Sequence, residues 1–177
     1  MEVKRKRTGK EWLIAGACVI ILLGTMILWQ AGVFGVTKSG LEKNAREAMK
    51  VDNMWENAQA VNEDLSAILF YSPGRENCTY AIYLNRDGFS FGYFLRESGM
   101  GPYIEEGVQE IIYEDKGIAL LSMNVDGISR IVSDNGTIQV NPEEPFVAVF
   151  PADCGKITLY DADGNIVEGK LYDRYTG

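Results

Sequence analysis

The apolar positions of this chain fall into two patterns, one long run near the N-terminus and many short runs after residue 62. No charged residue occurs from Leu13 to Trp29. A helix over this stretch would rise roughly 26 Å between Trp12 and Trp29, close to the hydrocarbon thickness of a bilayer. The two tryptophans stand where interfacial aromatic residues are expected. The pattern therefore predicts a transmembrane helix over residues 12–35, with Trp12 and Trp29 at the membrane interfaces.

The same run raises the alternative of a signal peptide that is cut away after secretion. Signal peptides usually have an apolar region of about 7 to 15 residues, followed by small residues at the cleavage site. Here the apolar run is longer, and the pair that comes nearest to a cleavage site is Val33 with Gly35. We therefore expect an anchor that stays on the protein.

Basic residues set the expected orientation of this helix. Five of them precede it, namely Lys4, Arg5, Lys6, Arg7 and Lys10. Lysine and arginine residues that flank a transmembrane helix favour its cytoplasmic side, and those that follow this run are more sparse. We expect residues 1–11 to form a basic cytoplasmic tip and the C-terminal domain to lie on the outer side of the cell membrane.

The segment after the apolar run has the spacing of an amphipathic helix. Residues 38–62 contain no proline, and their apolar positions recur near a period of 3.6 residues. These positions are Leu41, Ala45, Ala48, Trp55, Ala58 and Val61. We predict a juxtamembrane helix over residues 38–62, with Ser39 as its N-cap and its apolar face against the outer domain. The alternatives for this face are self-association and packing against a partner helix.

Residues 63–177 change to short runs rich in β-branched and aromatic residues, such as "CTYAIYLN" and "FVAVFP". Turn dipeptides stand between many of these runs, and they are Asp87-Gly88, Lys116-Gly117, Asp126-Gly127, Asn135-Gly136 and Asp163-Gly164. Short strands with such punctuation are typical of antiparallel hairpins. We predict a mainly β domain, arranged as an antiparallel meander or as an Ig-like sandwich.

The longest irregular segment of this domain is "ESGMGPYIEEG", residues 97–107. Its glycines and its proline disfavour both a helix and a regular strand ladder. Met100, Pro102 and Tyr103 are therefore the residues we predict for a binding loop. The alternative is a plain surface connection.

The charge of the chain is unevenly distributed. The formal net charge is -8, yet residues 63–177 carry eight basic against nineteen acidic side chains, a balance of -11. An acidic surface repels phosphate backbones, and no basic patch with interleaved aromatic residues is present in the sequence. We expect the domain not to bind nucleic acid, whereas the basic tip suits an anionic membrane surface.

The absence of histidine limits the chemistry of this chain. It excludes Ser-His-Asp and Cys-His catalysis and zinc sites built on histidine. The segment "LYDADGNIVEG" carries Asp161 and Asp163, but Gly164 and Glu168 do not have the spacing of an EF-hand loop, so we expect a hairpin turn there. We expect no metal, no cofactor and no enzymatic activity.

The enzyme alternative is a carboxylate-dependent hydrolase. It needs two carboxylates that face each other across a cleft, roughly 5 to 10 Å apart. The candidates are Glu105, Glu106, Glu110, Glu143 and Glu144.

Two of the three cysteines belong to the predicted outer domain. Cys78 and Cys154 would lie in an oxidising space, and two cysteines are the number for one bridge, whereas Cys18 falls in the apolar run. We treat a Cys78–Cys154 disulfide as one of two alternatives. In the other, both are small residues at strand ends.

Two resemblances bear on the role of the protein. The stretch "KRKRTG", which ends at Gly9, with the apolar run and a β-rich head after it, resembles the type IV pilins and pseudopilins, although Lys10 and Ile14 depart from that family's pattern. The phrases "FSFGYFLRESG", "GIALLSMNVDGISRI", "PFVAVFP" and "YDADGNI" are similar to those of small uncharacterised membrane-anchored extracellular proteins of Gram-positive bacteria. The second resemblance implies a location and a domain type, without an activity.

From these observations we expect an interaction, accessory or envelope-associated role at the cell membrane. The expected partners are the membrane itself and other envelope proteins. The alternatives are a pilin-like or pseudopilin-like subunit and the carboxylate-dependent hydrolase.

Overall fold

The computed structural model describes residues 9–88, 90–101, 104–168 and 171–175. The helical elements come first in the chain, and they are α1 (Gly9–Gln30), the short 3-10 helix η1 (Lys38–Gly40) and α2 (Leu41–Met49). The strands that follow are β1 (Glu56–Val61), β2 (Leu65–Tyr71), β3 (Cys78–Asn85), β4 (Tyr93–Gly99), β5 (Val108–Tyr113), β6 (Gly117–Ser122), β7 (Ile128–Ser133), β8 (Gly136–Gln139), β9 (Phe146–Phe150), β10 (Thr158–Asp161) and β11 (Leu171–Tyr175). The chain is therefore mainly β, as the sequence predicts.

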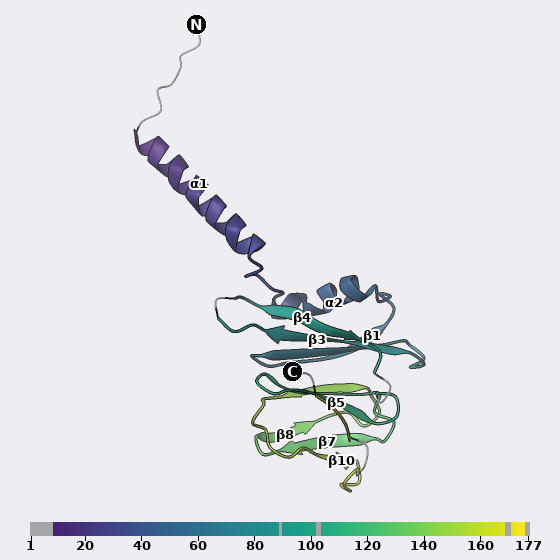
Figure 1. Cartoon of the computed structure of the whole chain (residues 1–177). Coiled ribbons are helices and arrows are strands. Elements are labelled where there is room, and N and C mark those ends of the chain that lie inside the picture. The colour runs from purple at the N-terminus through teal and green to yellow at the C-terminus, as the bar shows by residue number, and fades with distance from the viewer. Residues whose placement is uncertain (1–8, 89, 102–103, 169–170, 176–177) are drawn as a thin grey trace.

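Helix α1 projects away from the β domain (Figure 1). Its stretch Trp12–Gln30 has a mean hydropathy of 2.3, and none of it is buried against the rest of the chain. By length and composition this helix could cross a membrane, and an N-terminal signal sequence would have the same properties. The helix ends at Gln30 instead of continuing to residue 35, because Gly32 turns the chain at a φ of 64° and the next residues pair with the β domain.

The predicted helix over residues 38–62 is wrong beyond residue 49. Helix α2 ends where Lys50 takes a left-handed conformation, and the Val51 amide then donates to the carbonyl oxygen of Arg46 at 3.0 Å. An Asx turn at Asp52 follows, and residues 56–61 form strand β1. Ser39 lies inside η1, and Gly40 is the N-cap of α2, without a side-chain capping hydrogen bond.

The first sheet is an antiparallel meander in the order β1-β2-β3-β4. Alternation along β2 explains why all of its residues are buried. Leu65, Leu69 and their neighbours at every second position face the second sheet, whereas Ile68 and Phe70 face α2. One apolar run can therefore serve two cores.

The remaining strands form a second sheet, β11-β5-β6-β9, and a third sheet, β10-β7-β8. Strand β11 runs parallel to β5, and the other pairs are antiparallel. The molecule is layered as α2, first sheet, second sheet and third sheet (Figure 1). Consecutive strands β1 to β4 stay in one sheet, whereas an Ig-like sandwich divides consecutive strands between two sheets.

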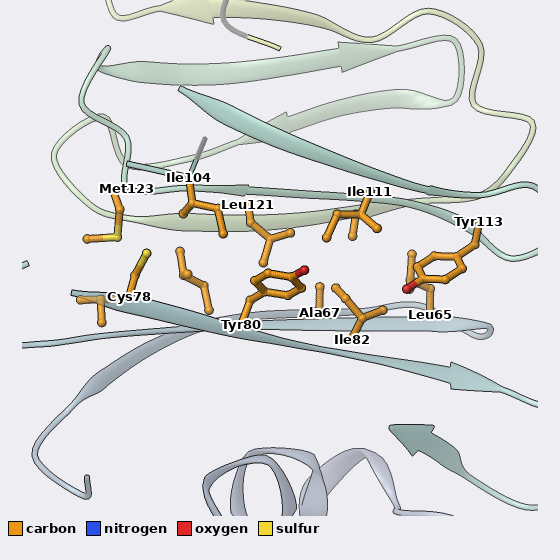
Figure 2. Packing of buried hydrophobic residues seen from close by; sticks show 13 residues of the cluster. Leu65, Ala67, Cys78, Tyr80, Ile82, Ile104, Ile111, Tyr113, Leu121 and Met123 are labelled. Carbon is orange, nitrogen blue, oxygen red and sulfur yellow. The ribbon is translucent and has the colours of Figure 1, made fainter. Parts of the chain in front are cut away.

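Each interface between layers has its own apolar core. Figure 2 shows the core between the first and second sheets, in which Tyr80 and Ile82 point toward Ile111 and Leu121. A second core fills the space between the second and third sheets, around Leu120, and a third one joins α2 to the first sheet. The first and second sheets are therefore covered on both faces, and the fold depends on all three cores.

The glycine of each predicted turn dipeptide has a positive φ, from 64° at Gly127 to 142° at Gly136. Strand boundaries agree closely where a run is both apolar and bounded by turns, as in β3. After the turn at Asp163-Gly164, Ile166 forms an isolated bridge with Tyr160.

Candidate functional site

The segment that follows α1 is hydrogen-bonded to the start of β4. The Gly35 amide donates to the carbonyl oxygen of Phe91 at 2.7 Å, and the Phe91 amide donates to that of Val33 at 2.8 Å. Val36 and Tyr93 exchange two further backbone hydrogen bonds, each of 2.8 Å. Residues 33–36 thus cover the outer edge of the first sheet, which holds the β3–β4 hairpin beside the end of α1.

Two glycines permit this close approach. A Cβ atom at Gly92 would lie 2.6 Å from the carbonyl oxygen of Val36, and one at Gly35 would lie 2.6 Å from that of Tyr93. Gly92 also has a φ of 87°, which residues with a Cβ rarely adopt. The backbone contact between the linker and β4 therefore requires glycine at both positions.

Replacing Gly92 with alanine is expected to weaken this contact more than a matched change at Gly88. Gly88 has a similar φ of 83°, but a Cβ there meets nothing within 4 Å. The left-handed conformation alone costs an alanine about 1 kcal/mol. We expect Gly88→Ala to lower the free energy of unfolding by about that amount and Gly92→Ala by roughly 1 to 2 kcal/mol more. Denaturant unfolding of the full chain in detergent micelles measures both, and equal losses would contradict the close approach.

Three exposed aromatic side chains lie in a row beside this contact. The ring centroids of Trp29 and Phe34 are 6.5 Å apart, and those of Phe34 and Phe91 are 5.9 Å apart and stacked. Their exposed fractions are 76% for Trp29, 44% for Phe34 and 53% for Phe91. We call these three residues the aromatic strip. It begins at the last turn of α1 and ends on the β3–β4 hairpin.

Arg86 joins the same region from the other end of the hairpin. Its guanidinium carbon lies 3.8 Å from the centroid of the Phe94 ring, and its Nη1 donates to the carbonyl oxygen of Gly32 at 3.4 Å. A cation over an aromatic face is an attractive arrangement. Arg86 therefore stands next to the point where the chain leaves α1.

A cavity of about 380 Å³ opens next to Arg86. Charged side chains of both signs line it, and they are Arg86, Arg96, Lys116, Asp87 and Asp115. Lys116 forms an ion pair with Asp87. The hydrogen bond to that carboxylate raises the pKa of Lys116, so this amine stays protonated at neutral pH. The cavity is thus polar and internally neutralised in part.

A carboxylate is held between the first and second sheets by two phenols. Tyr80 Oη donates to Glu97 Oε1 at 2.5 Å, and Tyr113 Oη donates to Glu97 Oε2 at 3.2 Å. Tyr80 is almost fully buried, so its hydroxyl needs a partner inside the fold. This arrangement joins β4 to β5 at the level of the main core and has an evident structural role.

The five candidate carboxylates of the hydrolase alternative occupy different parts of the fold. Glu105 accepts a hydrogen bond from the Cys78 thiol in the core between the first and second sheets. Glu110 is buried on β5, and its charge adds to the effect of burial in raising the pKa of Cys154, which lies on the opposite side of the second sheet. Glu106, Glu143 and Glu144 are exposed. Within the described part of the chain no group of three or more His, Cys, Asp or Glu is placed to hold a metal ion.

The structure contradicts the disulfide between Cys78 and Cys154. Both thiols are free, and both residues are buried. Cys78 belongs to the core between the first and second sheets, and Cys154 belongs to the core between the second and third. The second sheet separates them, so neither cysteine can reach the other without unfolding.

Because Cys78 is a buried thiol, stability should depend on alkaline pH. Burial, with a further effect of Glu105, raises the pKa of Cys78 to about 11 from its ordinary value of 9.0. Its contribution is complete below pH 9 and is lost as the pH rises through 11, because the unfolded chain ionises first. We expect the free energy of unfolding to fall over this window, and to fall less in Cys78→Ala. Unfolding curves from pH 8 to 11 measure the slope, and identical slopes for the two proteins would contradict the prediction.

The remaining predicted site residues have the following places. In the segment 97–107, Glu97 to Gly99 belong to β4 instead of a loop, because they pair with β3. Met100 is exposed, whereas Pro102 and Tyr103 lie outside the described residues. Trp12 and Trp29 are exposed at the two ends of α1, and Lys10 is exposed in its first turn. Lys4, Arg5, Lys6 and Arg7 lie outside the described residues.

Sequence reasoning missed Phe34, Phe91 and Arg86. A signal for Phe91 was present, because "GFSFGYFL", residues 88–95, is an uncharged aromatic run inside a strongly acidic domain. The regular part of β4 begins only at Tyr93, and Phe91, which precedes it, is half exposed.

Comparison of this chain with protein-family models, with curated proteins and with solved structures finds no match. The resemblances to pilins and to Gram-positive membrane-anchored proteins therefore stay predictions. What the chain does has to be argued from its own geometry.

Proposed function

We propose that the protein is a single-pass membrane protein, with a cytoplasmic N-terminus and an extracytoplasmic β domain that has a non-catalytic interaction or accessory role in the cell envelope. The observation that carries this proposal is the direct coupling of an exposed apolar helix to the first sheet. Helix α1 is apolar on all sides, and residues 33–36, which follow it, pair with β4.

The exposure of α1 supports a lipid environment. A helix that is apolar all round is stable when it is buried in protein or in a membrane. None of the stretch Trp12–Gln30 is buried in the domain. Lipid would supply the missing apolar surroundings, and every backbone group in the interior of the helix is already hydrogen-bonded within it.

The pairing of residues 33–36 favours an anchor over a cleaved signal. A cut between Gly35 and Val36 would remove the backbone groups of Val33 and Gly35 that pair with Phe91. It would expose part of the edge of the first sheet, and exposed edges invite association with other strands. The stretch that resembles a cleavage site is therefore part of the folded domain.

The proposed interaction role rests on the surface of the domain. The acidic domain offers a partly neutralised cavity near α1, and its candidate carboxylates are distributed over different layers. Acidic surfaces of this kind suit cationic partner proteins and disfavour nucleic acid. The partners we propose are other proteins of the envelope.

Topology tests this proposal directly. A reporter that is active only outside the cytoplasm, fused after Gly177, should be active, and the fusion should stay with membranes after carbonate washing. Replacing Lys4, Arg5, Lys6 and Arg7 with neutral residues should reduce the fraction of correctly oriented chains, because the positive residues favour the cytoplasmic side. An inactive fusion, or one that carbonate removes from membranes, would contradict the proposal.

A further inference from the structure

The aromatic strip leaves a large part of its apolar surface exposed to solvent. Trp29, Phe34 and Phe91 are each large, and each leaves 44% or more of its surface uncovered. Two of the three, Phe34 and Phe91, lie outside α1 on segments that pair with each other. An apolar surface built from two chain segments and continuous with the end of a helix calls for a common environment.

We propose that the aromatic strip, with Arg86 beside it, contacts the lipid headgroup region of the same leaflet from which α1 emerges. This inference rests on the proposed function, in which α1 spans the membrane. The domain then touches the bilayer at two places, the end of α1 and the stacked rings of Phe34 and Phe91. It is held against the membrane instead of hanging from a flexible linker.

The aromatic strip is continuous with the C-terminal end of α1. Trp29 lies next to the last residue of α1, where a transmembrane helix reaches the membrane interface. The rings of Trp29, Phe34 and Phe91 follow one another at centroid distances of 6.5 Å and 5.9 Å. Phe91 is thus connected through the Phe34 ring to Trp29 at the membrane interface. The backbone hydrogen bonds between residues 33–36 and the start of β4 hold it in this position.

The segments that hold the aromatic strip are uncharged, unlike the rest of the domain. The domain from residue 63 onward has a balance of -11, and acidic side chains are repelled by anionic lipids. Residues 28–37 and 88–95 nevertheless contain no charged side chain. The two segments that hold Phe34 and Phe91 are therefore free of acidic groups, as a membrane-facing surface of such a domain requires.

Arg86 places a cation beside the uncharged segments. Aromatic rings favour the membrane interface, and arginine binds phosphate groups well. Arg86 lies over the Phe94 ring and donates to Gly32, two residues after the end of α1. In the proposed arrangement its guanidinium stands near the lipid phosphates. The ligand is thus a phospholipid surface, recognised through aromatic burial with a cation beside it.

A fluorescent label at position 91 tests the contact in the full chain. The chain, with Cys18→Ser, is reconstituted into vesicles of phosphatidylcholine and phosphatidylglycerol, and Phe91→Cys carries an environment-sensitive label. The matched control is Ile166→Cys, because Phe91 and Ile166 have the same exposed fraction of 53% and Ile166 pairs with β10 in the third sheet. The buried Cys78 and Cys154 should label slowly, and the parent without an added cysteine measures that background.

Lipids with a nitroxide near the headgroup should quench the label at position 91 several-fold more than the label at position 166. Phe34→Cys is a second test site, in case the change at Phe91 disturbs the hairpin, and circular dichroism checks that each variant is folded. Equal and weak quenching at positions 34, 91 and 166 overturns the inference. Labels at positions 34 and 91 that are shielded from both lipid-bound and aqueous quenchers also overturn it, because a protein then covers the strip.

Flotation separates this inference from the proposal on which it rests. If the parent chain does not float with the vesicles after a carbonate wash, the membrane anchor fails, and the inference fails with it. If the chain floats and the label at position 91 is quenched only as weakly as that at position 166, only the inference fails.

Discussion

Truncation of Phe70 to alanine is expected to lower the free energy of unfolding by about 3 to 5 kcal/mol. Phe70 is fully buried between the first sheet and α2, and its ring lies under the guanidinium of Arg46, whose Cζ is 4.7 Å from the ring centroid. Alanine would leave a cavity and would remove this cation–π contact. Helix α2 would lose part of its apolar support, since its buried residues, Leu41 and Ala45, belong to the same core as Phe70.

Phe91→Ala is the matched control for this change. It removes the same atoms from a side chain that is half exposed on the aromatic strip. We expect it to change the free energy of unfolding in detergent by no more than about 1 kcal/mol, because little of the ring leaves a packed core. Urea unfolding, followed by circular dichroism, measures both variants. Similar losses for the two would contradict the assignment of Phe70 to the core and Phe91 to the surface.

The second large effect is expected at Asn124, which joins the β6–β7 connection to the β8–β9 connection. Its Nδ2 donates to the carbonyl oxygens of Ile128 at 3.0 Å and Asn141 at 2.9 Å, and its Oδ1 accepts from the Ile128 amide at 2.8 Å. Asn124 is buried, and its φ of 57° lies in the left-handed region that asparagine tolerates. Asn124→Ala would therefore leave buried groups without partners and would strain the backbone.

We expect Asn124→Ala to lower the free energy of unfolding by about 2 to 4 kcal/mol. Asn135→Ala is the control, because Asn135 is exposed and its side chain makes one long hydrogen bond of 3.4 Å, to Asp153. That change should stay within about 0.5 kcal/mol of the parent. Thermal unfolding of the three proteins under one condition measures the difference. A neutral Asn124→Ala would show that its hydrogen bonds do not hold the loops together.

The sequence predicted strands well where local signals agreed. Strand β3, Cys78–Asn85, is apolar at most positions and is followed by the turn at Asp87-Gly88, so pattern and turn chemistry point to one answer. In β2 every residue is buried because two layers cover it. The apolar run alone showed that residues 65–71 are a strand, but it could not show which layers they separate.

The failures have physical causes that lie outside the local sequence. Residues 56–61, "ENAQAV", have a helical spacing and modest apolarity, yet β2 needs a partner along its edge, and this tertiary pairing decides their structure. Strand β11 was missed because its pairing with β5 joins residues more than fifty positions apart. The disulfide prediction failed for a similar reason, since spacing does not show that a sheet separates two cysteines.

The site shows the same division between local and tertiary information. The aromatic content of residues 88–95 was visible, and so was the interfacial place of Trp29. That Phe91 and Phe34 stack beside Trp29 depends on the pairing of residues 33–36 with the hairpin, which no local pattern predicts. Gly35 and Gly92, which permit that pairing, could be recognised only from the positions of the opposing carbonyl oxygens.

The central claim is that α1 remains part of the mature protein and couples the domain to the membrane. The intact mass of the chain extracted from washed membranes tests it most directly. The full sequence has a mass of 19.7 kDa, and we expect the extracted protein to retain this mass, apart from processing of the first methionine. A mature chain that begins near Val36, recovered in the soluble fraction, would contradict the claim, because it would lack both α1 and the residues that pair with Phe91.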